Sequence, residues 1–266
     1  MLETKTKQTT KRLVFAASFA FLPSYCEPPS WLVPRQRPDR PTLAAEERGV
    51  TSLASRAANF LRIEPLDDSS PPVFVMRGEP RGPGKLVFLH GICGHALGYA
   101  QSFARSAAKH GTLIAPQGDR TCEGTPLAKW SSDTAALDER ISAAFRSLGF
   151  PEPINDVTAI GYSQGASRAE ALARKWPDRY TRLVLIAGPT KVSPFGLKVR
   201  SAAMMAGTLD RQDIMVASSK AFLAAGRRAQ YFTLPNARHG AMGDTPEASM
   251  QAALDWLYGE PATNTD

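Results

Sequence analysis

A serine lies between two glycines in the segment Ala159–Ser167, AIGYSQGAS. An apolar run precedes Ser163 and a helix-like stretch follows it, which predicts a sharp turn from a strand into a helix. Flanking glycines suit such a turn, because the serine needs a strained backbone and its neighbours approach too closely for a Cβ atom. A helix that begins here also directs free N–H groups at any anion formed beside the serine. The segment therefore predicts a nucleophile, and the alternative is a glycine-rich turn without a chemical role.

A serine hydroxyl is a weak nucleophile unless a base takes its proton. Of the four histidines in the chain, only His239 follows the serine, in the segment LPNARHGAMGD. It comes after a strand-like run and before the last predicted helix, so we expect it to be the base. The alternative is an exposed loop histidine. His90, in the sequence LHG, is expected to have a structural role in its loop.

An imidazole base needs a carboxylate that orients it and stabilises the imidazolium. Asp210 and Asp213 both follow the strand-like run Ser201–Gly207. Asp210 is favoured because it lies nearer the end of the strand, and Asp213 stays open as the alternative. The predicted triad, in chain order, is Ser163, Asp210 and His239.

The elements that would position these residues are short apolar runs separated by amphipathic stretches. The runs begin at Val73, Lys85, Gly111, Asp156, Arg182, Ser201 and Ala229. Most are continuously apolar rather than alternating, which is typical of strands buried on both faces of a parallel sheet. Helical spacing lies between or after them, over residues 137–148, 166–176 and 250–257. This alternation predicts an α/β fold with a doubly wound, mostly parallel sheet flanked by helices.

The serine turn, the order of the triad and the strand–helix alternation together resemble the α/β-hydrolase superfamily over about residues 72–258. The turn Gly207–Asp210 is similar to the acid turn of that family, and His239 is followed by glycine, as the family's histidine often is. The resemblance implies a serine esterase that cleaves small-molecule carboxylic esters through an acyl-enzyme, with no metal and no organic cofactor. The short segment between Gly188 and Ser201 implies that the site has no helical lid.

The same resemblance implies where a developing oxyanion would be held. The backbone N–H of Gln164, directly after the serine, is one expected donor. The second is the N–H of the residue after His-Gly, here Ile92, with its neighbour Cys93 as the alternative. A thioesterase, a peptidase and an acyltransferase would use the same triad. These activities stay open, as does a non-catalytic binding protein that keeps the fold.

The N-terminal residues predict export. Basic residues up to Arg12 precede the run Leu13–Leu22, LVFAASFAFL, which is too short to span a membrane but suits a signal peptide. Residues 1–26 are predicted to be a signal peptide. Residues 27–70 are predicted to be a linker rich in proline and arginine with a short helical segment, and residues 71–260 the catalytic domain. Cys26 adds a lipoprotein tether as an alternative, so periplasmic, secreted and membrane-anchored forms stay open.

The composition argues against two other classes of protein. The net charge of +7 is spread without basic blocks outside the N-terminus, which predicts no nucleic-acid partner. Three cysteines are too few for a disulfide scaffold. Removal or lipidation of Cys26 would leave Cys93 and Cys122 as a pair, and export would permit a bridge between them.

Overall fold

The computed structural model of the chain describes residues 63–66, 71–78 and 84–259. The predicted signal peptide, Cys26 and most of the predicted linker lie outside these residues. None of the helices within the described ranges is both long enough and apolar enough to cross a membrane.

The described residues contain an eight-stranded sheet with the order β1-β2-β4-β3-β7-β8-β9-β10. The strands are β1 (Ile63–Pro65), β2 (Val73–Met76), β3 (Gly84–Leu89), β4 (Gly111–Pro116), β7 (Val157–Tyr162), β8 (Tyr180–Ile186), β9 (Ser201–Gly207) and β10 (Ala229–Leu234). In this order, neighbouring strands from β4 to β10 run parallel. Strand β2 runs antiparallel to both of its neighbours, β1 and β4. Each apolar run expected to be a strand forms one, and the mostly parallel sheet confirms the predicted fold class.

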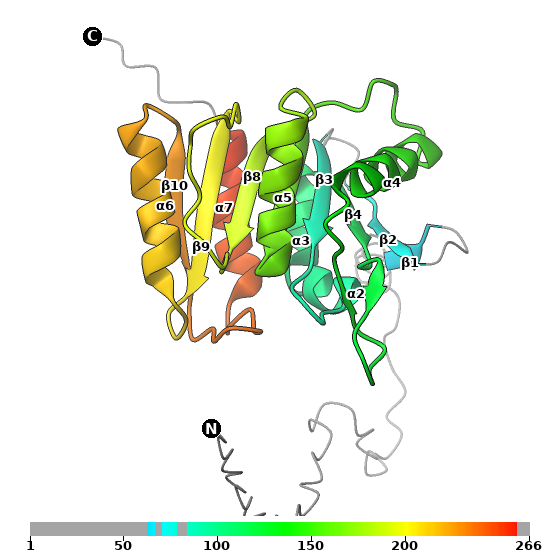
Figure 1. Ribbon diagram of the computed structural model, residues 1–266, viewed down its shortest axis with the longest axis horizontal. Coiled ribbons are helices and arrows are strands. Elements are labelled where there is room, and N and C mark those ends of the chain that lie inside the picture. The colour runs from blue at the N-terminus through cyan, green and yellow to red at the C-terminus, as the bar shows by residue number, and fades with distance from the viewer. Residues whose placement is uncertain (1–62, 67–70, 79–83, 260–266) are drawn as a thin grey trace, which may run out of the picture. The chain divides into compact units, whose positions relative to one another are not determined.

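Helices cover both faces of this sheet (Figure 1). One face carries α4 (Thr134–Ser147), α5 (Gln164–Lys175) and α6 (Gln212–Ala224). The other carries α2 (Ala96–Ala100), the 3-10 turn η2 (Gln101–Phe103), α3 (Ala104–His110) and α7 (Pro246–Tyr258). The three predicted stretches of helical spacing coincide with α4, α5 and α7, so the predicted helix positions are confirmed.

The two helical layers explain why the strand sequences are continuously apolar. Side chains of successive strand residues point to opposite faces of a sheet. In β7, Ala159 packs into the layer with α5, and its neighbour Ile160 packs into the layer with α7. In β8, Leu185 and Ile186 divide in the same way. A strand with helices on both sides has no face turned to water, so each of its positions favours an apolar residue.

Three local features lie outside the repeated strands and helices. The first two, strand β1 and the β5–β6 hairpin, were not predicted from the sequence. Strand β1 pairs with β2, so the sheet begins ahead of the predicted domain boundary at residue 71. A small hairpin of β5 (Arg120–Thr121) and β6 (Ala128–Lys129) follows β4. The segment of residues 187–200, all of it described, contains no helix, in agreement with the expected absence of a lid at this point.

Candidate active site

Ser163 occupies the turn between β7 and α5. Its backbone has φ 51° and ψ −114°, a conformation that side-chain-bearing residues rarely adopt. A Cβ atom on Gly161 would lie 2.3 Å from the carbonyl oxygen of Gly165. A Cβ atom on Gly165 would lie 1.9 Å from the carbonyl oxygen of Leu89 in β3. The close approach expected at both glycines is therefore confirmed, and it seats the first turn of α5 directly on the sheet.

The structure brings Ser163, His239 and Asp210 into one hydrogen-bonded chain. The Oγ atom of Ser163 lies 3.0 Å from Nε2 of His239. Nδ1 of His239 lies 2.8 Å from Oδ2 of Asp210, which can only accept. The proton therefore belongs on Nδ1, and the lone pair of Nε2 faces the serine hydroxyl. This is the geometry that a serine nucleophile and its base require.

Asp213, the alternative acid, lies apart from this chain. It stands in the first turn of α6, where its exposed carboxylate lies 3.3 Å from the guanidinium of Arg211. The side chain of Asp210 is only 11% exposed, and its second oxygen accepts the backbone N–H of Arg211 at 2.7 Å. The structure therefore brings Asp210 to the histidine and not Asp213.

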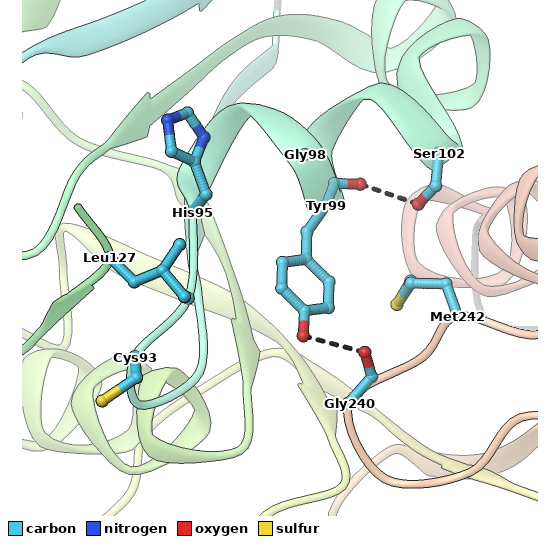
Figure 2. Close-up of a pocket in the computed structure, with 9 residues that line it drawn as sticks. Cys93, His95, Gly98, Tyr99, Ser102, Leu127, Gly240 and Met242 are labelled. Carbon is cyan, nitrogen blue, oxygen red and sulfur yellow. Dashed lines mark hydrogen bonds between the residues drawn. The ribbon is translucent and has the colours of Figure 1, made fainter. Parts of the chain in front are cut away.

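Two tyrosines hold the peptide that follows His239. The backbone N–H of Gly240 donates to the hydroxyl of Tyr162 at 2.6 Å. The hydroxyl of Tyr99 donates to the carbonyl oxygen of Gly240 at 3.0 Å, as the dashed line in Figure 2 shows. Their rings lie 5.0 Å apart, and burial raises the pKa of Tyr162 to about 12. Tyr162 is buried, as packing alone would predict, but the pattern in the sequence gave no signal for its bond to the histidine loop or for Tyr99.

The two predicted oxyanion donors belong to segments that lie beside the serine. Gln164 is the first residue of α5, where backbone N–H groups have no partner within the helix. Ile92 directly follows Gly91, and a Cβ atom on Gly91 would lie 3.4 Å from Cβ of Ser163. Ile92 itself is 59% exposed. The oxyanion role of both N–H groups stays a prediction.

Hydrogen bonds brace the loop that carries Ile92. Gly94 and Ala128 exchange backbone bonds of 3.0 and 3.1 Å, which ties the loop to the β5–β6 hairpin. The indole N–H of Trp130 donates to the carbonyl oxygen of His90 at 2.7 Å. The side chain of Gln164 in turn accepts the N–H of Trp130 at 3.0 Å and donates to its carbonyl at 3.2 Å. A loop held in this way can keep its N–H groups in place before any substrate binds.

His90 is buried and neutral, as a structural residue should be. Its Nδ1–H donates to the carbonyl of Gly91 at 2.7 Å, and its Nε2 accepts the N–H of Gly118 at 2.8 Å. Burial lowers the pKa of this imidazole from 6.5 to about 4. Protonation would leave Nε2 unable to accept, so the folded protein resists it.

The lowered pKa of His90 predicts acid sensitivity. Between pH 6.5 and 4 the unfolded chain binds a proton here that the folded chain does not, so stability falls as the pH falls. The full difference is about 3 kcal/mol. Urea unfolding of the wild type from pH 7 to 4.5 should show this slope, and His90→Gln should flatten it. His110 also has a pKa lowered by burial, so part of the slope should remain. An unchanged slope in His90→Gln would contradict the assignment.

Cys93 and Cys122 form a disulfide. It links the loop of Ile92 to the β5–β6 hairpin across 29 positions of the chain. A bridge over a loop of this length stabilises a folded protein by about 2–4 kcal/mol. The double variant Cys93→Ser, Cys122→Ser should therefore unfold at a lower urea concentration, and a reductant should lower the midpoint of the wild type but not of the variant. Equal midpoints for both proteins without reductant would contradict this.

No group of three or more His, Cys, Asp or Glu side chains placed to hold a metal ion occurs in the part of the chain that the structure describes.

Comparison with known proteins yields structural similarity only. No family model matches the chain, and no curated protein sequence does. Among solved structures, the fluorophosphonate-binding serine hydrolase FphF of Staphylococcus aureus is similar with a TM-score of 0.54 and 14% identity, covering 71% of this chain and 92% of that one. The carboxylesterase of Mesorhizobium loti has a TM-score of 0.52 and 20% identity, covering 72% and 98%. That of Bacillus cereus has a TM-score of 0.50 and 20% identity, covering 70% and 92%.

These neighbours are similar over nearly their whole length, and at such low identity they establish the fold and nothing more. The mostly parallel sheet and its two helical layers agree with that likeness. The chain has the α/β-hydrolase fold.

Proposed function

We propose that this protein is a serine hydrolase that cleaves carboxylic esters of small molecules through an acyl-enzyme intermediate. The observation that carries the proposal is the hydrogen-bonded chain from Ser163 through His239 to Asp210, placed on a strained strand–helix turn. The similar solved structures named above, a serine hydrolase and two carboxylesterases, support the same class.

The proposed reaction has two halves, acylation of Ser163 and hydrolysis of the acyl-enzyme, and the same groups act in both. Oγ of Ser163 attacks the ester carbonyl while Nε2 of His239 takes its proton, and the carbonyl electrons move onto oxygen. The N–H groups of Ile92 and Gln164 would stabilise that oxyanion. When the tetrahedral intermediate collapses, the imidazolium gives its proton to the departing alkoxide. Water then attacks the acyl-enzyme with His239 again as base, which releases the acid and restores Ser163.

Labelling with a fluorophosphonate probe tests the proposal, because such probes react with activated serines. We expect one labelled site, located by mass spectrometry at Ser163 and absent from Ser163→Ala. Ser167→Ala, four positions further along the chain in α5, is the matched control and should label like the wild type. A folded wild type that takes no label, beside a control hydrolase that does, would overturn the proposal in favour of a non-catalytic binding protein.

A substrate panel then separates reactions that share the triad. We expect hydrolysis of simple carboxylic esters to exceed that of matched thioesters and amides. Product analysis with an added alcohol distinguishes hydrolysis, which yields the acid, from acyl transfer, which yields a new ester. Preference for thioesters, amides or alcohol acceptors would keep the proposed nucleophile and change the class of reaction.

We also propose that the protein is exported. The basic and apolar residues that precede residue 23 suit a signal peptide, and the Cys93–Cys122 disulfide suits an oxidising compartment. Mass spectrometry of the protein from its natural host gives the mature N-terminus. A chain that begins after the apolar run would support export, and an intact Met1 would overturn it. A lipid on Cys26 would indicate a membrane tether, whereas an unmodified chain that begins beyond Cys26 would exclude one.

A further inference from the structure

A cavity of about 430 Å³ lies between the loop that carries Cys93 and the loop that carries Gly240. Figure 2 shows the ring of Tyr99 between these two loops, with Leu127 on one side and Met242 on the other. Cavities that bind small molecules have about this volume. We call it the Tyr99 cavity.

The Tyr99 cavity begins beside the reacting groups. Cys93 follows Ile92, the proposed oxyanion donor, and Gly240 follows His239, the proposed base. The ring of Tyr99 lies 5.0 Å from that of Tyr162, which directly precedes Ser163. The cavity is therefore lined by residues that directly follow the proposed oxyanion donor and the proposed base, and it is the space next to the site into which an arm of the ester would extend.

The lining of the cavity offers little to a charged group. Among the described residues that line it there is no Asp, Glu, Lys or Arg. Its hydroxyl groups already have partners, because Tyr99 donates to Gly240 and Ser102 donates to the carbonyl of Tyr99 at 2.7 Å. The remaining polar side chain, His95, has its ring 5.6 Å from that of Phe74. A charged arm would therefore meet no Asp, Glu, Lys or Arg side chain with which to pair on these walls.

We propose that the Tyr99 cavity binds an uncharged, apolar arm of the ester and sets its preferred length. This inference rests on the proposed function. An apolar arm would replace water against Leu127, Met242 and the face of Tyr99. Each methylene that becomes buried there should raise kcat/KM about two- to fourfold until the cavity is full.

Two ester series distinguish the acyl arm from the alcohol arm. In the first, p-nitrophenyl esters keep the leaving group and lengthen the acyl chain from acetate to dodecanoate. In the second, acetate esters keep the acyl group and lengthen the alcohol from ethyl to octyl. We expect kcat/KM to rise with length and then level off in one series, and esters with a terminal carboxylate or ammonium on that arm to react at least tenfold more slowly.

Gly98 provides a position where an apolar side chain can be added to the wall of the cavity without a clash at its Cβ atom. It lines the cavity from helix α2, and a Cβ atom built on it meets no heavy atom within 4 Å. Gly98→Leu should leave kcat/KM for the shortest ester within about twofold and lower that for the longest esters at least tenfold. Gln101→Leu, an exposed position close by that does not line the cavity, is the matched control. It should leave the length profile unchanged.

The outcomes separate this inference from the proposed function. A length profile shortened by Gly98→Leu in the acyl series assigns the cavity to the acyl arm, and in the alcohol series to the alcohol arm. If Gly98→Leu folds, takes the fluorophosphonate label and keeps the wild-type profile in both series, the inference is overturned while the serine hydrolase stands. If the wild type takes no label and cleaves no ester, the proposed function itself has failed.

Discussion

Replacing Asp210 with asparagine is expected to lower kcat about 10⁴-fold while leaving the fold intact. Asparagine has the same size, but its amide group can donate to Nδ1 of His239 and so favours the tautomer whose proton points at Ser163. The imidazole would then be unable to take the serine proton. The side chain of Asp210 is almost buried, so little water is present to replace its role. Steady-state kinetics on a simple ester, with thermal unfolding as a check on folding, measures the effect.

Asp213→Asn is the matched control for this prediction. It makes the same chemical change three positions along the chain, at a carboxylate that pairs with Arg211 on the surface. Its kcat should stay within about twofold of the wild type, because loss of an exposed ion pair has a small effect. A large loss in Asp213→Asn together with a small one in Asp210→Asn would show that the acid had been misassigned.

Adding one methyl group at Gly165 is expected to be the most damaging small substitution in the serine turn. The new Cβ atom would lie 1.9 Å from the carbonyl oxygen of Leu89 and 2.7 Å from that of His90. Both obstacles are backbone atoms, so α5 must move away from β3 and carry Ser163 with it. Gly165→Ala should lower the free energy of unfolding by about 3 kcal/mol. A displaced nucleophile should also lower kcat about 100-fold.

Gly98→Ala is the matched control for Gly165→Ala. It tests whether the losses come from the close contact at Gly165 or from replacing any glycine with alanine. Gly98 lies in helix α2 and has open space around its Cβ position. Alanine is favoured over glycine within a helix by about 0.5–1 kcal/mol, so this variant should be at least as stable as the wild type. Urea unfolding of both variants gives the comparison. Wild-type stability and activity in Gly165→Ala would mean that the helix does not rest on β3 as described.

The sheet could be predicted because a strand buried on both faces has a continuous apolar sequence. Runs such as β7 and β8 are apolar at successive positions, and few other elements of their length are. The short strands β5 and β6 carry no such mark, because two residues in a hairpin show no periodicity. Strand β1 was also missed. It lies at the edge of the sheet, and its pairing depends on β2 rather than on its own pattern.

The residues of the candidate site that directly follow a strand could be predicted from their order along the chain. Contacts that only the tertiary structure creates could not be predicted. Ser163, Asp210 and His239 each follow a recognisable strand, and parallel strands bring such positions to one edge of a sheet. Their hydrogen bonds agree with the predicted grouping, and their catalytic roles stay predictions. The disulfide was left open, because the distance between Cys93 and Cys122 is a property of the tertiary structure. Tyr99 lies 141 positions from Gly240, and no local pattern connects them.

The hydrogen bond between Tyr162 and Gly240 holds the histidine loop in place during the acyl-enzyme stage of the proposed catalytic cycle. Once Ser163 is acylated, its oxygen has no proton to share with His239, and the resting bond between them is lost. The neighbours of these two residues, Tyr162 and Gly240, remain joined, because neither takes part in the reaction. With its pKa raised to about 12 by burial, Tyr162 keeps its proton at neutral pH. The proposal therefore expects the His239 imidazole to keep the same position in acylation and deacylation. Deacylation would then need no rearrangement of the histidine loop before water attacks.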